Sequence, residues 1–349
     1  MAVSVSRTWT LNSGMEGLDK LKFNDTTISS VGHHEVLVRF HYASLNYRDV
    51  QMTTGKNISN VKDNVVPGSD GAGIVIAIGS AVTRFKAGDK VLTVFANVFG
   101  SPTLDDFLNL PLGGAQDGTF RQYGVFNEER LVTMPASLTF QEASCLTCAG
   151  VTAWNALYGL PCYSIKPGDV VLTQGTGGVS TFAIHFAKIA GATVIATTSS
   201  EERVEFLKNM ALPPDHIINY KTDPNWGDTA KSLSPDGQGV DHVIEIGGPG
   251  TLEQSFKAIK LGGLISVIGY RGGISGEAPA FVEIIRRNCI LRGVLVGNRQ
   301  HLEEMIHAID ANRIKPILDP KEWKLEELKE AYEYMLESKH LGKVTIRID

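Results

Sequence analysis

The sequence predicts an α/β protein of two domains: a small, mostly β domain, and a domain with a doubly wound parallel sheet. Three observations lead to this prediction. The chain has 349 residues, too many for one typical hydrophobic core. Short β-type segments with frequent glycine turns fill its first part. In the part that follows, strands and helices alternate, which is typical of a parallel sheet.

Residues 1–149 contain short apolar segments of the kind that forms β-strands. Each is rich in β-branched or aromatic residues and ends near a glycine or polar turn. The expected strands are 35–43, 73–79 and 89–95. Their close spacing predicts a small, mostly β domain.

Residues 150–296 are predicted to form the parallel-sheet domain. Its apolar runs are rich in Val, Ile and Leu, as in strands buried on both faces. The expected strands are 169–173, 193–197, 241–246, 263–269 and 289–297, separated by helical patterns at 178–190, 201–210 and 250–260. Two amphipathic helices, 301–313 and 325–338, precede a last strand, 343–348. We expect that strand to return to the first domain, which assigns residues 297–349 to it.

The composition is that of an ordinary globular protein, 43% hydrophobic and 20% charged. A net charge of −5 argues against a nucleic-acid partner, which calls for a basic face. No run of 18 apolar residues occurs, and the first residues lack an apolar targeting segment, so we expect no membrane association. Four cysteines do not make a disulfide scaffold, and a cytoplasmic location is expected.

A glycine-rich turn lies between the predicted strand 169–173 and the helix after it. Glycines let the backbone turn tightly and approach a pyrophosphate bound at the helix N-terminus. Ser180 stands where the third glycine of the usual motif would be, and we expect it to displace the site slightly without destroying it. The turn therefore predicts a dinucleotide cradle. Its residues are Gly175, Thr176, Gly177, Gly178 and Val179.

The end of the next strand indicates which nucleotide binds. An acidic residue there would hold the ribose of NAD, but residues 197–200 are Thr-Thr-Ser-Ser. Arg203 can supply a bidentate contact to a 2′-phosphate, and Tyr220 can line the adenosine pocket. Glu201 and Glu202 lie nearby and would favour NAD if either turned inward. The sequence favours NADPH. The contacts expected at the strand end are Ser199 and Ser200.

Five motifs in order make the sequence resemble the medium-chain dehydrogenase/reductase superfamily. It is most similar to the zinc-independent quinone oxidoreductase and enoyl reductase branch. The resemblance implies a GroES-like β domain plus a Rossmann domain, with cofactor and substrate in the cleft between them. The motifs are ASLNYRDVQMTTGK (43–56), VPGSDGAGIVIAIGSAVTRFKAGDKV (66–91), CAGVTAWNAL (148–157), GTGGVS (175–180) and HLGKVTI (340–346).

The resemblance implies particular site residues. It puts Asn46 near the nicotinamide and Thr152 behind the ring. Backbone groups around Gly269 and Val296 are expected near the carboxamide, and Lys343 near the phosphates. Asn46 could donate an amide N–H to a substrate carbonyl or to the cofactor, although an Asn at this place could equally cap a turn.

Two tyrosines are further candidates for the reaction. Tyr47 is either a proton donor or a wall of the pocket. Tyr270 follows a predicted strand, at the end where open α/β sheets bind ligands. Asp49 has a structural alternative, because it can pair with Arg48 or cap the following turn.

The residues that would bind catalytic zinc are mostly missing. In zinc alcohol dehydrogenases a cysteine occupies the place of Asn46, and a His-Glu pair that of Ser69 and Asp70. Only Cys148 remains, and one thiolate cannot build the three-ligand site that catalytic zinc needs. We therefore expect no metal. Cys145 and Cys148 form a C-x-x-C in an apolar context, where buried cysteines acting as small hydrophobes are expected.

Without a metal, hydride transfer from NADPH to an activated acceptor needs only orientation and a hydrogen bond to a carbonyl oxygen. The expected substrate is a quinone or an α,β-unsaturated carbonyl compound. Three alternatives remain open: an alcohol dehydrogenase that recruits a metal through Cys148 and Asp70, a nucleotide-binding protein with a structural role, and non-redox chemistry. The strand 289–297, at the expected sheet edge, predicts a homodimer. The segment 97–118 fits an active-site lid or a flexible excursion.

Overall fold

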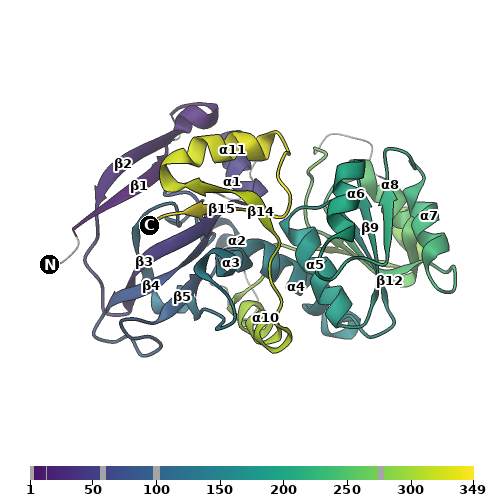
Figure 1. Cartoon of the computed structure of the whole chain (residues 1–349), viewed down its shortest axis with the longest axis horizontal. Coiled ribbons are helices and arrows are strands. Elements are labelled where there is room, and N and C mark those ends of the chain that lie inside the picture. The colour runs from purple at the N-terminus through teal and green to yellow at the C-terminus, as the bar shows by residue number, and fades with distance from the viewer. Residues whose placement is uncertain (1–3, 13, 56–59, 97–102, 274–278) are drawn as a thin grey trace. The chain divides into compact units, whose positions relative to one another are not determined.

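The computed structural model describes residues 4–12, 14–55, 60–96, 103–273 and 279–349. The chain divides into two compact units (Figure 1). Unit 1 comprises Met1–Val151 and Gly297–Asp349, and unit 2 comprises Thr152–Val296. The predicted domain boundaries lie at 149/150 and 296/297. The boundaries between the two units lie at 151/152 and 296/297.

Unit 1 is organised around a seven-stranded sheet with the order β14-β15-β3-β4-β5-β7, in which β6 also pairs with β3. The predicted strands 35–43, 73–79 and 89–95 correspond to β3, β4 and β5. The last strand of the chain, β15, lies antiparallel to β3, with Thr345 opposite Ser44. The C-terminal segment thus completes the N-terminal sheet. The strand bounds are β3 Glu35–Ser44, β4 Asp70–Ile78, β5 Lys90–Thr93, β6 Tyr123–Asn127, β7 Leu131–Thr133, β14 Leu318–Lys324 and β15 Lys343–Arg347.

The remaining elements of unit 1 cover this sheet. An antiparallel hairpin joins β1 (Val5–Leu11) to β2 (Leu21–Thr27). Large side chains with almost no exposure, such as Phe40, Phe120 and Tyr332, fill the core. The helices and single turns are η1 Gly17–Lys20, α1 Tyr47–Thr53, α2 Leu104–Asn109, η2 Glu128–Arg130, α3 Phe140–Ala143, the π-helical η3 Leu146–Gly150, α10 Arg299–Asn312, η5 Leu325–Glu327 and α11 Leu328–Leu336.

Unit 2 contains a six-stranded parallel sheet with the order β10-β9-β8-β11-β12-β13. The chain winds outward from β8 to β10 and then returns to β11 and continues to β13. With right-handed crossovers, this order puts the helices of the two halves on opposite faces of the sheet. The strands are β8 Val170–Gln174, β9 Thr193–Thr198, β10 His216–Asn219, β11 Val240–Glu245, β12 Ile259–Val267 and β13 Ile290–Gly293. The helices are α4 Val151–Tyr158, η4 Pro161–Tyr163, α5 Gly178–Ile189, α6 Glu201–Lys208, α7 Trp226–Leu233, α8 Pro249–Ala258 and α9 Val282–Arg287.

The predicted fold class, α/β with a mostly β domain and a doubly wound parallel-sheet domain, is confirmed. The edge strand β13, however, is shorter than the predicted 289–297. Val296 has a φ of 48°, a conformation that a β-branched residue adopts only under strong constraint and that cannot continue a strand.

The segment 97–118 falls partly outside the described residues, since 97–102 are not among them. From Thr103 onward, α2 begins with the Thr103 hydroxyl accepting the Asp106 N–H at 3.1 Å. A tight turn follows, in which the Gly113 N–H donates to the Gln116 carbonyl at 2.7 Å. In the described part of the chain, no helix is both long and apolar enough to cross a bilayer.

Candidate functional site

The glycine turn after β8 leaves its backbone accessible. Gly175 has a φ of 76°, which favours glycine strongly. Gly177 is the N-cap of α5 and supplies no side-chain cap. A Cβ added at either glycine would meet no atom within 4 Å, so open space faces the turn. Uncapped N–H groups at the start of a helix, beside open space, fit a pyrophosphate group.

Ser180 has a specific role in this turn. Its side chain is fully buried, and its hydroxyl donates to the Gln174 carbonyl at 2.6 Å. The hydroxyl thus connects the first turn of α5 to the end of β8. A small residue that can make this bond keeps helix and strand close together, which is the role of the third glycine in the usual motif.

Arg203 lies at the glycine turn. Its Nη1 donates to the hydroxyl of Thr176, which is almost completely buried. The half-buried Ser200 is the N-cap of α6, and its hydroxyl accepts the Arg203 N–H at 3.4 Å. Two predicted contact residues therefore also hold the local structure. A positive charge stands beside the open turn.

Two acidic residues, Glu201 and Glu202, lie at the surface near this turn. Glu202 is exposed, and Glu201 accepts a hydrogen bond from the Asn219 amide at 2.7 Å on the exposed surface. Tyr220, 38% exposed, follows β10, and its backbone N–H donates to the Thr198 carbonyl at 2.9 Å. Ser199 is half-buried at the end of β9.

A buried polar pair, Gln174 and Glu245, connects the two neighbouring strands at which the strand order of the sheet reverses. The Gln174 amide donates to the Glu245 carboxylate at 2.7 Å, joining the carboxyl ends of β8 and β11. Glu245 also accepts the backbone N–H groups of Gly247 and Gly248, at 2.9 and 3.0 Å. This pair is not among the predicted site residues. Its only indication was polar residues at the ends of two adjacent buried strands.

A second missed residue, Asn155 of α4, supports the strained Val296. Its amide donates to the Val296 carbonyl at 2.8 Å, and its side-chain oxygen accepts from Arg292 at 2.7 Å. Thr152 is buried one turn earlier on the same helix. Gly269 and the half-buried Tyr270 follow β12.

In unit 1, Asn46 stands at the start of α1 and is 8% exposed. Its backbone N–H donates to the Asp49 carboxylate at 2.8 Å. The other Asp49 oxygen accepts from Arg48 at 3.2 Å. The expected pairing of Asp49 with Arg48 thus occurs, while its capping bond goes back to Asn46 and not to the following turn. Burial raises the pKa of Asp49 to about 6, although Arg48 and the Asn46 N–H act in the opposite direction.

Lys343 is buried within unit 1. We expected it near the cofactor phosphates, but its ammonium is 3% exposed and donates to three acceptors within unit 1. These are the Asn46 side-chain oxygen at 2.6 Å, the Leu45 carbonyl at 2.8 Å and the Asp70 carboxylate at 3.3 Å. An ammonium has three donors, and all three are used here. These bonds place Lys343 within unit 1, and its contact to a cofactor phosphate stays a prediction.

Two of the positions that carry zinc ligands in zinc alcohol dehydrogenases, Asn46 and Asp70, contact this ammonium. Asp70, fully buried, accepts from the Ser69 hydroxyl at 2.8 Å and from the Ser44 hydroxyl at 3.0 Å, as well as from Lys343. Burial raises the pKa of Cys148 to about 12, which keeps its thiol neutral. A neutral thiol is a poor metal ligand, and a fixed ammonium repels a metal cation. Among the described residues, no group of three His, Cys, Asp or Glu side chains could hold a metal ion. The residues present do not fit a catalytic zinc.

Cys145 is also a free, buried cysteine, and burial raises its pKa to about 12. The two cysteines of the C-x-x-C are therefore packed as neutral thiols. Tyr47, the first residue of α1, is 37% exposed and lies next to Asn46 in the sequence. Unit 1 thus brings together Asn46 and Lys343, with Tyr47 adjacent.

Comparison with known proteins identifies the family. Residues 32–136 match the model of the alcohol dehydrogenase GroES-like domain, and residues 178–311 match the model described as zinc-binding dehydrogenase. A zinc-type alcohol dehydrogenase-like protein of Schizosaccharomyces pombe is 41% identical over 347 residues, covering 98% of this chain and 99% of that protein.

Two further comparisons concern reductases. A crotonyl-CoA carboxylase/reductase of Cereibacter sphaeroides is 30% identical over 273 residues, which are 68% of this chain and 63% of that protein. The solved structure of the crotonyl-CoA carboxylase/reductase AntE in complex with NADP shares the fold, with a TM-score of 0.85 over 99% of this chain and 95% of that chain at 23% identity. With its glycine turn, its two units and these matches, the chain belongs to the medium-chain dehydrogenase/reductase superfamily of oxidoreductases.

Proposed function

We propose that this protein is a zinc-independent reductase that uses NADPH to transfer a hydride to a quinone or an α,β-unsaturated carbonyl acceptor. The observation that carries the proposal is the buried Lys343 ammonium, which is bonded to Asn46 and Asp70. A protein cation occupies the environment in which zinc relatives would hold a metal. The similarity to a crotonyl-CoA carboxylase/reductase favours enoyl compounds within this substrate class.

The residues of unit 2 support a dinucleotide with a 2′-phosphate. Gly175 and Gly177 leave room for the pyrophosphate at the start of α5. Arg203 brings a guanidinium to the glycine turn, where its Nη1 donates to the Thr176 hydroxyl. An Arg is suited to bind phosphate oxygens in pairs. NADPH, when bound, supplies the hydride.

In unit 1, Asn46 is proposed to orient the acceptor. Lys343 holds the Asn46 side-chain oxygen at 2.6 Å, which fixes the amide and directs its N–H₂ away from the ammonium. The positive charge also draws electrons from the amide, so its N–H becomes a stronger donor. A preorganised donor of this kind stabilises the negative charge that develops on a carbonyl oxygen during reduction.

Reduction of a carbon–carbon double bond also requires a proton at the carbon next to the carbonyl group. Tyr47 and Tyr270 are the proposed donors or pocket walls. Both carry a hydroxyl that can transfer a proton, and both keep part of their surface exposed. Replacing each in turn by Phe separates the two roles, because a wall residue tolerates the loss of its hydroxyl.

The proposal is tested by NADPH oxidation with metal-stripped protein. The acceptors are a quinone, an α,β-unsaturated ketone, an unsaturated aldehyde and an enoyl thioester, with NADH as the alternative donor. Turnover of one class with NADPH is the expected result. Stoichiometric, tightly held zinc whose removal abolishes activity would instead identify an alcohol dehydrogenase. NADPH binding without turnover of any acceptor would favour a structural or non-redox role.

A further inference from the structure

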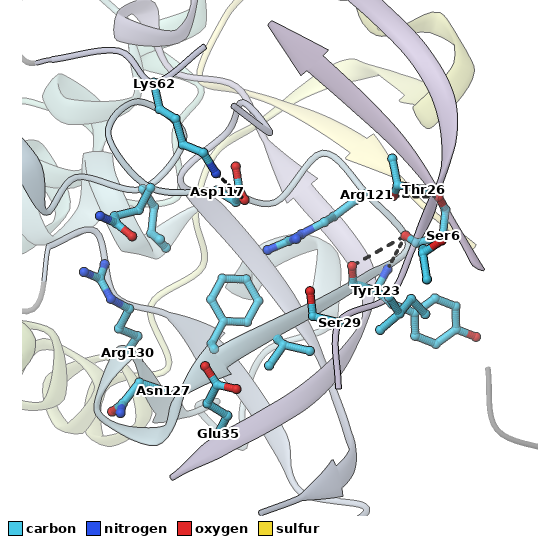
Figure 2. Close-up of a pocket in the computed structure, with 16 residues that line it drawn as sticks. Ser6, Thr26, Ser29, Glu35, Lys62, Asp117, Arg121, Tyr123, Asn127 and Arg130 are labelled. Atoms are coloured by element: carbon cyan, nitrogen blue, oxygen red, sulfur yellow. Dashed lines mark hydrogen bonds and ion pairs between the residues drawn. The ribbon is translucent and has the colours of Figure 1, made fainter. Parts of the chain in front are cut away.

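Unit 1 contains a pocket of about 320 Å³ that none of the roles above uses. It lies against the β1–β2 hairpin, β3 and β6, as Figure 2 shows. Its volume is at the lower end of the range for small-molecule sites. Both apolar and polar side chains line it, among them Phe126, Val125, Ser29 and Glu35. The pocket therefore has the size and the mixed lining of a site for a small metabolite.

Arg121 is the unusual residue of this pocket. Its side chain extends into the pocket in Figure 2, and its Nε is buried without a hydrogen-bond partner. Across the described residues, its guanidinium takes part in no hydrogen bond or ion pair. One face of the guanidinium stacks on Phe126, 5.1 Å from the ring centre. A buried Nε–H without an acceptor is costly unless a ligand accepts it.

The charge of Arg121 persists at neutral pH. Burial lowers the pKa of Arg121 only to about 10, and Asp117 acts in the opposite direction. Asp117 does not neutralise it directly, because its oxygens accept from the Lys62 ammonium at 3.0 Å and from the Val66 N–H at 3.1 Å. The nearest acidic residue is therefore already engaged.

The other charged residues of the lining do not neutralise Arg121 either. Arg130 donates from Nη1 to the Leu110 carbonyl at 3.0 Å and has no carboxylate partner among the described residues. Glu35 accepts the Gly32 N–H at 2.8 Å through one oxygen. Figure 2 shows Arg121 and Glu35 entering the pocket from different sides. A ligand with its anionic group at Arg121 and a hydroxyl or amino group toward Glu35 would satisfy both.

We infer that this pocket binds a small organic anion whose carboxylate or phosphate group accepts hydrogen bonds from Arg121. The planar guanidinium offers paired N–H donors that match two oxygens of such a group. The apolar surface of Phe126 and Val125 accommodates a short carbon skeleton. The site belongs wholly to unit 1 and is independent of the proposed reaction.

The test is calorimetric titration of the full chain with succinate and with inorganic phosphate. Putrescine serves as a cationic counter-probe. The wild-type protein should bind at least one anion with millimolar or tighter affinity, and Arg121→Gln should weaken it about tenfold or more, as expected for the loss of a charged hydrogen bond. Arg121→Lys, which keeps the charge but loses the paired donors, should lie between them.

Two variants make the result specific. Arg7 also stacks on an aromatic ring, Phe23, at 4.9 Å, but it pairs with Glu326, so Arg7→Gln should bind anions as the wild type does. Phosphate could also bind at the glycine turn, so the pocket's signal must persist in Arg203→Glu. If Arg121→Gln does not fold, Arg130→Gln takes its place and should weaken the binding of the anion. The inference is overturned if no anion binds, if Arg121→Gln binds equally well, or if putrescine binds in place of the anions.

Discussion

At the scale of single residues, Lys343 is the most informative side chain of unit 1. It is a buried cation whose three donors all have acceptors, and one of these is the fully buried Asp70. A buried ion pair is weak evidence for stability, because its attraction must offset the desolvation of both charges. The position of the Lys343 ammonium on the Asn46 oxygen indicates instead that it orients and polarises that amide.

Replacing Lys343 by Met is expected to reduce kcat by about tenfold to a hundredfold, because the Asn46 amide loses its fixed orientation. The dissociation constant of NADPH should change little, since acceptors of unit 1 already use all three donors of Lys343. Steady-state kinetics and fluorescence titration of NADPH measure the two quantities. A much larger dissociation constant of NADPH with unchanged kcat would instead support the contact between Lys343 and a cofactor phosphate.

Lys343→Met also leaves Asp70 without its charged partner, which destabilises the fold. The double variant Asp70→Asn with Lys343→Met removes both charges and serves as the stability control. It should recover most of the free energy of unfolding but not kcat. Recovery of both quantities would show that Lys343 acts only through stability.

Arg203 is the single residue that we propose selects the nucleotide. Arg203→Glu should weaken NADPH binding by about tenfold to a hundredfold, the loss of one charged hydrogen bond, and should leave NADH binding nearly unchanged. The measurement is kcat/KM with each nucleotide. Lys208→Glu makes the same charge change at the other end of α6, where Lys208 pairs with Glu205, and should keep the preference. An unchanged preference in Arg203→Glu would contradict the NADPH assignment.

At the scale of elements, the short helix α1 shows how local capping positions a site residue. The helix has only seven residues, and Asp49 in its first turn accepts the Asn46 N–H. Arg48 pairs with Asp49 and also donates to the Leu112 carbonyl at 3.0 Å. These bonds fix the backbone from which the Asn46 side chain extends.

The raised pKa of Asp49, about 6 against 3.8 ordinarily, predicts a pH dependence of stability. Between these values the folded state binds more protons than the unfolded state, so the contribution of Asp49 to stability is lost as the pH rises. Asp49→Asn lacks this dependence. Relative to the wild type, its free energy of unfolding should rise by up to about 3 kcal/mol between about pH 4 and about pH 7.

Urea unfolding at both ends of this range measures the effect. Asp106→Asn is a control of opposite sign, because hydrogen bonds from Thr103 lower the pKa of Asp106. The contribution of Asp106 is present above its ordinary pKa and lost as the pH falls, so its Asn variant should become relatively less stable as the pH rises. Parallel curves for Asp49→Asn and the wild type would refute the raised pKa.

At the scale of the whole molecule, the sheet of unit 2 ends in β13, whose outer edge has no partner strand among the described residues. Apolar side chains near it remain accessible: Leu291 is 36% exposed and Leu295 is 38% exposed. Open edges with apolar side chains are usually covered, and pairing with a second copy across a twofold axis covers both at once. This arrangement favours the predicted homodimer.

The dimer is expected to elute in size-exclusion chromatography at twice the chain mass of 37.8 kDa. Leu291→Lys puts a charge on the edge strand and should shift the protein to the monomer. Leu336→Lys changes a leucine of similar exposure, 44%, on α11 of unit 1 and should leave the dimer intact. Wild-type protein that elutes as a monomer would rule the dimer out.

Patterns between neighbouring residues were enough to predict much of this protein. The apolar runs predicted β3 and most strands of the parallel sheet, and the order of strand, glycine turn and helix predicted the cradle at Gly175. These features depend on residues a few positions apart, so their periodicity is visible in the sequence. The resemblance added the expectations about Asn46 and about zinc, because both concern which residue stands at a motif position.

Only the tertiary structure decided the contacts between distant segments. Lys343 reaches Asn46 because β15 pairs with β3 in a particular register, across nearly the whole length of the chain. Sheet packing likewise joins Gln174 to Glu245, and folding leaves Arg121 unpaired in a pocket. The register of distant strands depends on the packing of the whole unit, and no local pattern records it. The sequence therefore specified the elements and their chemistry, while their pairing specified which charges meet.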